Sequence, residues 1–409
     1  MTSINSSLFL LFLGMEVIRQ SASHELTRRI LPFWMERMED PCGGFYGRID
    51  GTGELDRHAC KGAVLNARIL WTFASAFRVL GDRKYLDTAL RAADFMRKHF
   101  LDKEFGGVFW SLNADASPLE TKKQYYAIAF AIYGFAELYR ATGDGDALDT
   151  AISLYRDIEA HSLDRGGYSE ASARDWKPIE DVRLSEKDQN DARTMNTHLH
   201  ILEAYTALYR VWKDEGLAAS LKGLIRIFLD RIILENGHMG LFFDEDWHLN
   251  SSVVSYGHDI EASWLLIEAA EVLGEDGLKE IAGTASRKMA LAAMEGFSAD
   301  GGMKNEFDPG RPGINPPRDW WVQAETVTGC LHQYKLTGSP VWLEHAKEEW
   351  DFIMKNISCP DGEWYWAALP DGNGFRPELA EDRAGFWKCP YHNGRMCLEI
   401  IENLDDSVL

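Results

Sequence analysis

The stretch that decides the fold is Gly106-Gly107-Val108-Phe109-Trp110, followed shortly by Tyr125-Tyr126-Ala127-Ile128-Ala129-Phe130-Ala131-Ile132-Tyr133-Gly134-Phe135. The second segment is apolar nearly all round at helical period, and such a helix must be surrounded by protein. The helix before the glycines is amphipathic instead, with apolar positions recurring at three and four residues: Leu86, Leu90, Ala93, Met96 and Phe100. An outer helix, a glycine turn and a buried inner helix therefore form one unit.

This unit recurs six times, at spacings of roughly sixty to seventy residues. The other glycine marks are Gly43-Gly44-Phe45-Tyr46, Gly166-Gly167-Tyr168, Gly240-Leu241-Phe242-Phe243, Gly301-Gly302-Met303 and Gly362-Glu363-Trp364-Tyr365. The pattern predicts inner helices over 61–80, 122–142, 192–212, 258–273, 320–337 and 391–404. It predicts outer helices over 16–38, 84–100, 147–160, 217–234, 277–294 and 341–357. Six inner and six outer helices in alternation predict an all-α chain folded as an (α/α)6 barrel, or toroid.

Residues 15–409 are expected to form one catalytic domain, because no linker or charge block interrupts the repeats. Residues 1–14 are expected to be an N-terminal extension outside the core. Their apolar run, residues 8–13, is too short to span a membrane and has no basic segment before it, as a signal peptide would. Met15 then opens a polar helical segment, so we expect translation to start there.

Composition narrows the function classes. The chain has 43 basic and 64 acidic residues and a net charge of −21, which argues against nucleic-acid or membrane partners. Its six cysteines lack metal-ligand spacing and are expected to be reduced thiols, as in a cytoplasmic protein. Its 14 Trp, 14 Tyr and 20 Phe fill a core, and aromatic residues also line sugar-binding clefts.

Polar residues gather where the inner helices begin. If these helices start at one rim, their first turns converge on a central cleft. Four of the 12 histidines lie there: His198, His200, His258 and His392. Asn196 and His200 are four residues apart and share a helix face, whereas His198 points elsewhere and is expected to be structural.

His258 and Glu261 also share a face, so we expect this carboxylate to bond the imidazole and fix its tautomer. A metal site is the competing use of a His-x-x-Glu pair. We expect no second such pair on a facing helix, and therefore no metal.

Trp321 and Trp387, beside Glu325 and His392, are either platforms for a sugar ring or ordinary core residues. Arg68 lies in an otherwise apolar helix and must find a buried ion pair or a substrate oxygen. Histidines with an arginine suit proton abstraction beside a carbonyl, since a neutral imidazole is a base and an arginine stabilises an enediolate. In an open-chain aldose sugar, this proton is the one on C2. Inversion at C2 needs an acid and a base on opposite faces of that carbon, whereas isomerisation to a ketose needs one group that moves the proton from C2 to C1.

At these residues the chain resembles the N-acylglucosamine 2-epimerase superfamily, and within it the cellobiose 2-epimerases, from about residue 16 to 405. The motifs that carry the resemblance are Lys61-Gly62-Ala63-Val64-Leu65-Asn66-Ala67-Arg68-Ile69-Leu70-Trp71, Met195-Asn196-Thr197-His198-Leu199-His200, Ser255-Tyr256-Gly257-His258-Asp259-Ile260-Glu261-Ala262-Ser263-Trp264, Trp320-Trp321-Val322-Gln323-Ala324-Glu325 and Trp387-Lys388-Cys389-Pro390-Tyr391-His392-Asn393-Gly394-Arg395. The resemblance implies an (α/α)6 barrel, in agreement with the repeats.

The resemblance implies reversible C2 epimerisation of the reducing-end glucose in β-1,4-linked disaccharides, such as cellobiose, lactose and mannobiose, through ring opening and a cis-enediolate. It makes His258 and His392 the acid/base pair, and His200 and Arg68 the groups that bind the O1/O2 region. The other implied substrate contacts are Tyr126, Asp188, Asn196, Glu261, Trp321, Glu325 and Trp387. It implies no cofactor, a disaccharide as the partner, and a monomer or weak homo-oligomer. Which histidine serves which epimer stays open.

Three alternatives remain at this point. One is a mannose or glucose isomerase or 2-epimerase of the same superfamily, differing in loops such as 361–383. Another is a glycoside hydrolase that uses Glu261 and Glu325 as its two carboxylates. The last is a sugar-binding module without catalysis.

Overall fold

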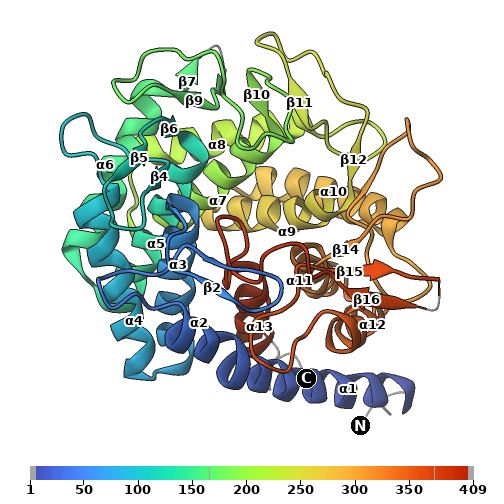
Figure 1. The fold of residues 1–409 in the computed structure, drawn as a ribbon. Coiled ribbons are helices and arrows are strands. Elements are labelled where there is room, and N and C mark those ends of the chain that lie inside the picture. The colour runs from blue at the N-terminus through green and yellow to red at the C-terminus, as the bar shows by residue number, and fades with distance from the viewer. Residues whose placement is uncertain (1–5, 165, 373, 404–409) are drawn as a thin grey trace.

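The inner helices of the predicted repeats are present in the computed structural model, which describes residues 6–164, 166–372 and 374–403 and is mostly helical (Figure 1). They are α3 (Ala63–Leu80), α5 (Tyr125–Thr142), α7 (Met195–Val211), α9 (Tyr256–Leu273), α11 (Trp320–Thr337) and α13 (Tyr391–Asn403). Each packs against the next in chain order, and α13 packs against α3. The six helices therefore contact one another in a closed sequence.

The outer helices cover these six. They are α1 (Ser6–Glu25) with α2 (Leu31–Arg37), α4 (Arg83–Phe95), α6 (Gly145–His161), α8 (Glu215–Ile227), α10 (Asp276–Ala293) and α12 (Val341–Asn356). Single turns of π-helix extend or join them at Leu26–Ile30, Met96–Phe100 and Phe228–Ile232, and a 3-10 turn, Met294–Gly296, ends α10. Helices α3, α5, α7, α9 and α11 each pack on the outer helix that follows, whereas α13 packs on α1. The predicted alternation is confirmed.

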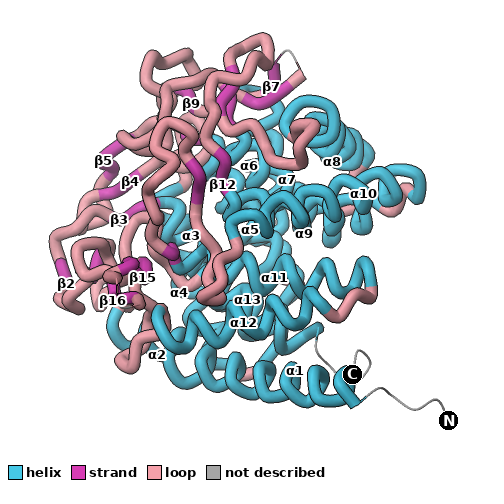
Figure 2. Tube along the Cα trace, turned by 90° about the vertical axis from the view of Figure 1, so that its right-hand side faces the viewer, coloured by secondary structure: helices cyan, strands magenta, loops and turns pink. Residues whose placement is uncertain are grey.

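Short strands, which the all-α prediction omitted, gather on one side of the helices (Figure 2). Those before inner helices are β3 (Lys61–Gly62), β6 (Lys123–Gln124), β10 (Arg193–Thr194), β12 (Val254–Ser255) and β14 (Arg318–Asp319). Their antiparallel partners, in the same order, are β4 (Ser111–Leu112), β9 (Ala171–Ser172), β11 (Phe242–Phe243), β13 (Glu306–Phe307) and β15 (Ala367–Pro370). Each partner strand follows the next glycine turn, so each repeat is joined to its successor at this rim.

The strands explain why some predicted helix boundaries were wrong. Helices expected from residues 61, 122 and 192 begin at Ala63, Tyr125 and Met195, because the residues just before them are extended and paired. The remaining strands are β1 (Arg48–Ile49), β2 (Leu55–Asp56), β5 (Pro118–Glu120), β7 (Leu163–Asp164), β8 (Gly167–Tyr168) and β16 (Phe375–Pro377). A bridge between Ile49 and Ala384 joins the first repeat to the last.

The double glycines adopt a backbone conformation that other residues avoid. Gly44 has φ +62° and Gly107 has φ +64°, in the left-handed region. A Cβ atom on Gly44 would lie 2.5 Å from the Phe95 ring, and one on Gly107 would lie 2.8 Å from the Trp176 ring. The glycine marks in the sequence therefore reflect tight turns packed against aromatic rings.

A buried carboxylate, Glu363, links the last repeat to the first. It accepts hydrogen bonds of 2.6 Å each from the Trp34 indole N–H on α2, from the Lys388 ammonium and from the Asn393 amide on α13. All four side chains have 0% exposure. This group, the Glu363 cluster, stabilises the place where the closed sequence of helices meets.

Helix α3 is long and apolar enough to span a membrane on composition, alone in this respect among the described helices, but 78% of it is buried inside the protein. All six cysteines are free thiols, as expected. Residues 1–5 lie outside the described residues, and α1 begins at Ser6, so it passes through the predicted boundary at Met15, which is itself buried. That residues 1–14 form an extension outside the core stays a prediction.

Candidate active site

Side chains from the starts of the inner helices meet around two aromatic residues. The Tyr126 ring on α5 lies 5.0 Å from the His200 ring on α7 and 5.9 Å from Trp387, measured between centroids. The Trp321 ring on α11 lies 4.7 Å from His258 on α9 and 5.7 Å from His392 on α13. The three predicted catalytic histidines are thus brought together with both predicted sugar platforms, and Trp321, Trp387, His258 and Asn196 are only half-buried.

His200 is fixed by a carboxylate on its own helix. Its Nδ1 atom lies 2.9 Å from Oε2 of Glu203, three residues on, and both side chains are buried. The expectation that no second His-x-x-Glu pair exists was therefore wrong, and sequence reasoning missed Glu203. Burial lowers the pKa of His200, so the imidazole is neutral near pH 7.

His258 is fixed by Ser255, and the predicted bond to Glu261 is not formed. Nδ1 of His258 lies 2.7 Å from Oγ of Ser255, the N-cap residue of α9. Helical side chains lean toward the N-terminus of their helix, which brings the His258 ring to the cap and away from Glu261 one turn later. Burial lowers the pKa of His258 as well, so it rests neutral with its Nε2 unbonded in the described structure.

Replacing Ser255 by Ala is expected to lower kcat by roughly ten- to a hundredfold, because the imidazole loses the group that orients it. The lost cap costs about 1 kcal/mol of stability. The matched control is Asp214→Ala, which removes the cap of outer helix α8 and touches no histidine. Kinetics and thermal melting of both variants check this: equal losses of kcat in the two would show that Ser255 acts through stability alone.

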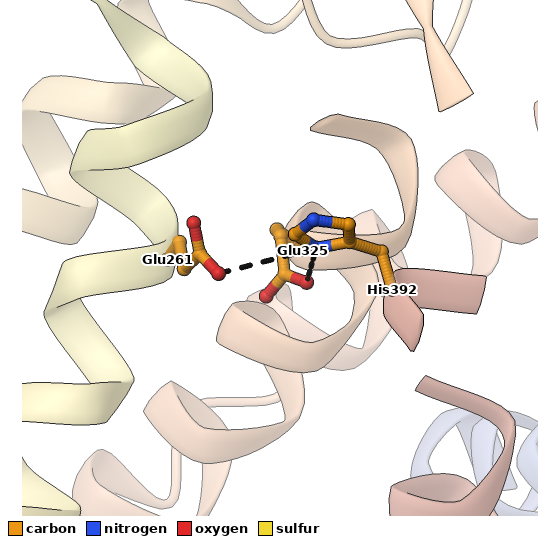
Figure 3. A group of neighbouring side chains, drawn as sticks. All are labelled: Glu261, Glu325 and His392. Atoms are coloured by element: carbon orange, nitrogen blue, oxygen red, sulfur yellow. Dashed lines mark hydrogen bonds and ion pairs between the residues drawn. The ribbon is translucent and has the colours of Figure 1, made fainter. Parts of the chain in front are cut away.

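His392 is bonded to Glu325. Its Nδ1 atom lies 2.7 Å from Oε1 of Glu325 and 3.9 Å from Oε1 of Glu261 (Figure 3). Burial, followed by the positive charges of Arg68 and Arg395, lowers the pKa of His392 well below its ordinary value. The ring is neutral, and its Nε2 has no hydrogen-bond partner within the described residues.

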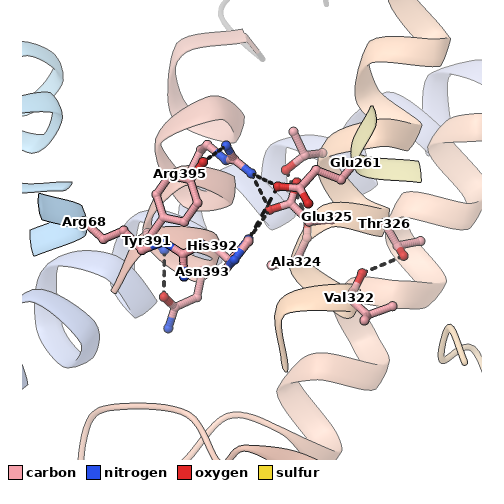
Figure 4. A network of polar contacts seen from close by, with 12 residues as sticks. Arg68, Glu261, Val322, Ala324, Glu325, Thr326, Tyr391, His392, Asn393 and Arg395 are labelled. Atoms are coloured by element: carbon pink, nitrogen blue, oxygen red, sulfur yellow. Dashed lines mark hydrogen bonds and ion pairs between the residues drawn. The ribbon is translucent and has the colours of Figure 1, made fainter. Parts of the chain in front are cut away.

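Arg395 connects the carboxylates behind the histidines (Figure 4). Its Nη2 donates to Oε1 of Glu261 at 2.8 Å and to Oε1 of Glu325 at 2.7 Å, and its Nη1 donates to Glu203 and Tyr391. Burial and the charge of Glu325 raise the pKa of Glu261 to about 8. Burial raises the pKa of Glu325 as well, so these two neighbouring carboxyl groups hold a proton more readily than free glutamates do. Substrate contact by Glu261 and Glu325, which are 1% and 0% exposed, stays a prediction.

Glu261, Glu325 and His392 also offer three metal-ligand atoms within 4.8 Å of one another. The guanidinium of Arg395 already bonds both carboxylates and supplies the positive charge that a metal ion would bring. These contacts favour a role for the group in positioning His392, and the absence of a metal stays a prediction.

Arg68 has no carboxylate partner in the described part of the chain. Nη2 donates to the Tyr126 hydroxyl at 2.8 Å, and Nη1 lies 3.9 Å from Sγ of Cys389. The guanidinium also lies 4.1 Å from the Phe130 ring centroid and 4.9 Å from that of Tyr391. Of the two partners open to Arg68, the structure rules out the buried ion pair within these residues and favours a substrate oxygen.

The other predicted residues divide into three cases. Asn196 has a buried Oδ1 without a partner, as a substrate-binding group would. Asp188 lies in the loop between β9 and β10, where its Oδ2 accepts 2.9 Å bonds from the Ser185 N–H and hydroxyl, and no described contact ties it to the histidines. His198 bonds the Thr194 carbonyl and the Tyr168 N–H with its two nitrogens, which fits the expected structural role.

The profile of the N-acylglucosamine 2-epimerase family matches residues 44–388. A cellobiose 2-epimerase of Bacteroides fragilis is 53% identical over 391 residues, covering 94% of this chain and 99% of that protein. The chain belongs to this family of carbohydrate epimerases, among the cellobiose 2-epimerases. A cellobiose 2-epimerase of Ruminococcus albus is 40% identical, with 92% and 96% coverage.

Solved structures agree with this membership. The structure of cellobiose 2-epimerase from Bacillus thermoamylovorans superposes on the epimerase described here with a TM-score of 0.90 at 36% identity, covering 95% of this chain and 99% of that one. A D-mannose isomerase superposes with a TM-score of 0.79 at 19% identity, covering 95% and 97%. That second likeness shows a shared fold alone.

Four residues around the histidines were missed or left unassigned from the sequence: Glu203, Ser255, Tyr391 and Arg395. A signal existed for each. Ser255 is a favoured N-cap residue directly before a helix. Glu203 follows His200 at a one-turn spacing, and Tyr391 and Arg395 flank His392 within one helical turn.

Proposed function

We propose that this epimerase inverts C2 of the reducing-end glucose in cellobiose, lactose and mannobiose. The observation that carries the proposal is a pair of neutral imidazoles, His258 and His392, whose rings both lie close to one half-buried indole, Trp321. Each has its Nδ1 bonded, to Ser255 or to Glu325, so each offers Nε2 for a proton. Inversion requires such a pair, because the proton leaves one face of C2 and returns to the other.

The proposed reaction begins with opening of the sugar ring. Nε2 of one histidine removes the C2 proton, the electrons of that C–H bond form a C1=C2 double bond, and the π electrons of the carbonyl move to O1 to give a cis-enediolate. Arg68 donates hydrogen bonds to the oxygen on which the charge forms, and these bonds strengthen as the charge develops, while Nε2 of the neutral His200 accepts a hydrogen bond from the O2 hydroxyl. The other histidine enters this step with a proton taken up at Nε2 from solvent water. After rotation within the bound sugar it gives that proton to the opposite face of C2, the first histidine releases the proton it removed to water, and the ring closes as mannose.

The remaining roles are also proposals. Trp321 and Trp387 stack on the sugars, and Tyr126, Asn196 and Asp188 bond hydroxyl groups. The reaction is written without a cofactor. We propose a cytoplasmic enzyme, monomeric or weakly self-associating, that binds neither nucleic acid nor membranes, in keeping with the charge of −21.

For the architecture we propose the closed (α/α)6 barrel. It is supported by the contacts of each inner helix with the next, including α13 with α3, and by the outer helix packed on each of them.

Two other functions are less well supported. A monosaccharide isomerase would need only one histidine to move the proton from C2 to C1. A glycoside hydrolase would need two carboxylates that flank the glycosidic bond. Glu261 and Glu325 are instead joined by a single nitrogen of Arg395, which leaves no space for a sugar linkage between them.

Proton NMR of the purified protein with cellobiose in D₂O tests the proposal. We expect deuterium at C2 and a new mannose-type anomeric signal. Free glucose would instead identify a hydrolase. Unchanged cellobiose, with mannose converted in a parallel sample, would identify a monosaccharide enzyme.

A further inference from the structure

Two buried arginines lie close to the ring of the same tyrosine, Tyr391, and differ in how their charges are balanced. Arg68 lies 4.9 Å and Arg395 lies 4.2 Å from the centroid of the Tyr391 ring (Figure 4). Arg395 bonds the carboxylates of Glu203, Glu261 and Glu325. Arg68, with only 3% of its surface exposed, bonds a phenol and a thiol and has no carboxylate among the described residues.

The donors of Arg68 are mostly unused. A guanidinium has five N–H groups, and Arg68 makes two hydrogen bonds, one of them a long contact to sulfur. Its Nε is buried without a partner. The flat faces of Phe130 and Tyr391 hold the group in place, but cation–π contacts repay only part of the cost of removing the charge from water. The free protein thus keeps an unbalanced buried cation.

The groups around Arg68 leave this positive charge in place. His200 and His392 are neutral, because burial lowers the pKa of each. Burial raises the pKa of the Tyr126 hydroxyl and of the Cys389 thiol, so neither is an anion at neutral pH. Among charged groups, Arg68 has the largest influence on the pKa of His392, ahead of Arg395 and Glu203. The carboxylates nearby are already shared with Arg395.

We propose that Arg68 makes this site a receptor for open-chain aldonic acids of β-1,4-linked disaccharides, with cellobionate as the representative ligand. An aldonate has a planar C1 that carries two oxygens and a full negative charge, next to C2 and its oxygen. It therefore presents the charge and the flat geometry of an enediolate in a stable molecule, and compounds that imitate a transition state bind tightly. The choice of disaccharide rests on the proposed function, whereas the preference for an anion rests on Arg68.

The enzyme binds such a ligand but cannot convert it. The C2 proton of a carboxylate is far less acidic than that of an aldehyde, so the bound aldonate is not turned over. Reactions that oxidise the reducing-end aldehyde of a disaccharide would supply it. Oxidised disaccharides would thereby inhibit the epimerisation of the unoxidised ones.

Isothermal titration calorimetry with two matched ligands tests the proposal. Cellobionate is compared with cellobiitol, its open-chain neutral analogue with a hydroxyl at C1. For the unchanged enzyme we expect cellobionate to bind roughly ten- to a hundredfold more tightly, the range of a hydrogen-bonded charge pair. In Arg68→Gln this advantage should disappear while cellobiitol still binds. Arg68→Lys, which keeps the charge but loses the fork, should retain part of it.

The control removes a different cation from the same helix. Arg78 on α3 is ion-paired with Glu137 and Glu402, so Arg78→Gln should leave the preference for cellobionate unchanged. Equal binding of the two ligands by the unchanged enzyme, binding of neither, or an advantage that survives in Arg68→Gln would overturn the proposal. Turnover of cellobiose without any preference for the aldonate removes this inference alone. A preference without turnover removes the proposed function and leaves the anion site.

Discussion

The His392→Asn variant should lose roughly a thousandfold or more in turnover of cellobiose and should no longer admit solvent deuterium at C2, because general acid–base catalysis contributes about 10²- to 10⁴-fold. Asparagine retains a hydrogen-bond donor that can face Glu325, the present partner of the ring at 2.7 Å. It has no basic nitrogen, so it can neither accept the C2 proton in one direction of the reaction nor return a proton to C2 in the other. The change removes proton transfer and preserves most of the packing.

Two measurements distinguish this result from a folding defect. Cellobiitol should still bind the variant within a few-fold of the unchanged enzyme, and the melting temperature should shift little. As a control, His345→Asn changes a histidine of outer helix α12, paired there with Glu348, and should leave turnover intact. Normal epimerisation by His392→Asn would remove this residue from the chemistry.

The second large effect concerns stability. Replacing Glu363 by Ala should lower the free energy of unfolding by about 3–5 kcal/mol, the usual cost of breaking a buried ion pair. The substitution leaves the Lys388 ammonium, the Trp34 indole and the Asn393 amide without their shared acceptor in the Glu363 cluster. Because Lys388 is fully buried, no water molecule replaces the lost carboxylate as a partner of its charged ammonium group.

Denaturant unfolding of three variants tests this expectation. Asp87→Ala, which breaks the exposed pair with Arg83 on α4, should change stability by less than about 1 kcal/mol. The double variant Glu363→Leu with Lys388→Met should recover part of the loss, since it removes both charges together. A loss at Glu363 no larger than that at Asp87 would contradict a stabilising role for the Glu363 cluster.

Most of the architecture could be predicted from the sequence, because the spacing of apolar residues along a helix shows directly which of its faces are buried. Helix α5 has no polar face, so it had to be enclosed, and the amphipathic α4 had to lie outside. The rim strands were not predictable in the same way. Lys61–Gly62 is a two-residue strand, too short for an alternating pattern, and its partner Ser111–Leu112 lies fifty residues away.

The sequence predicted which residues belong to the site, but it predicted less well which hydrogen bonds and ion pairs join them. Sequence spacing identifies which residues share a helix face, so His258 was paired with Glu261. The actual partner, Ser255, precedes the helix and is reached because helical side chains lean backward. The link from Arg395 to Glu203 spans 192 positions, and no local pattern predicts such a contact. For Arg68 the sequence left two partners open, and the structure shows no ion pair for it among the described residues, so the substrate oxygen stays a prediction.

The contact between α13 and α3 also determines at which point of its synthesis the chain completes its active site. A ribosome releases the five other inner helices before Trp387, His392 and Arg395 have been translated. Until then the nascent chain is an open arc, whose end helices α3 and α11 lack the neighbour that covers their apolar sides in the finished fold. Such unpaired surfaces are prone to aggregation. Catalytic competence and protection from aggregation are therefore acquired together, in one late step, when the last helix docks on the first.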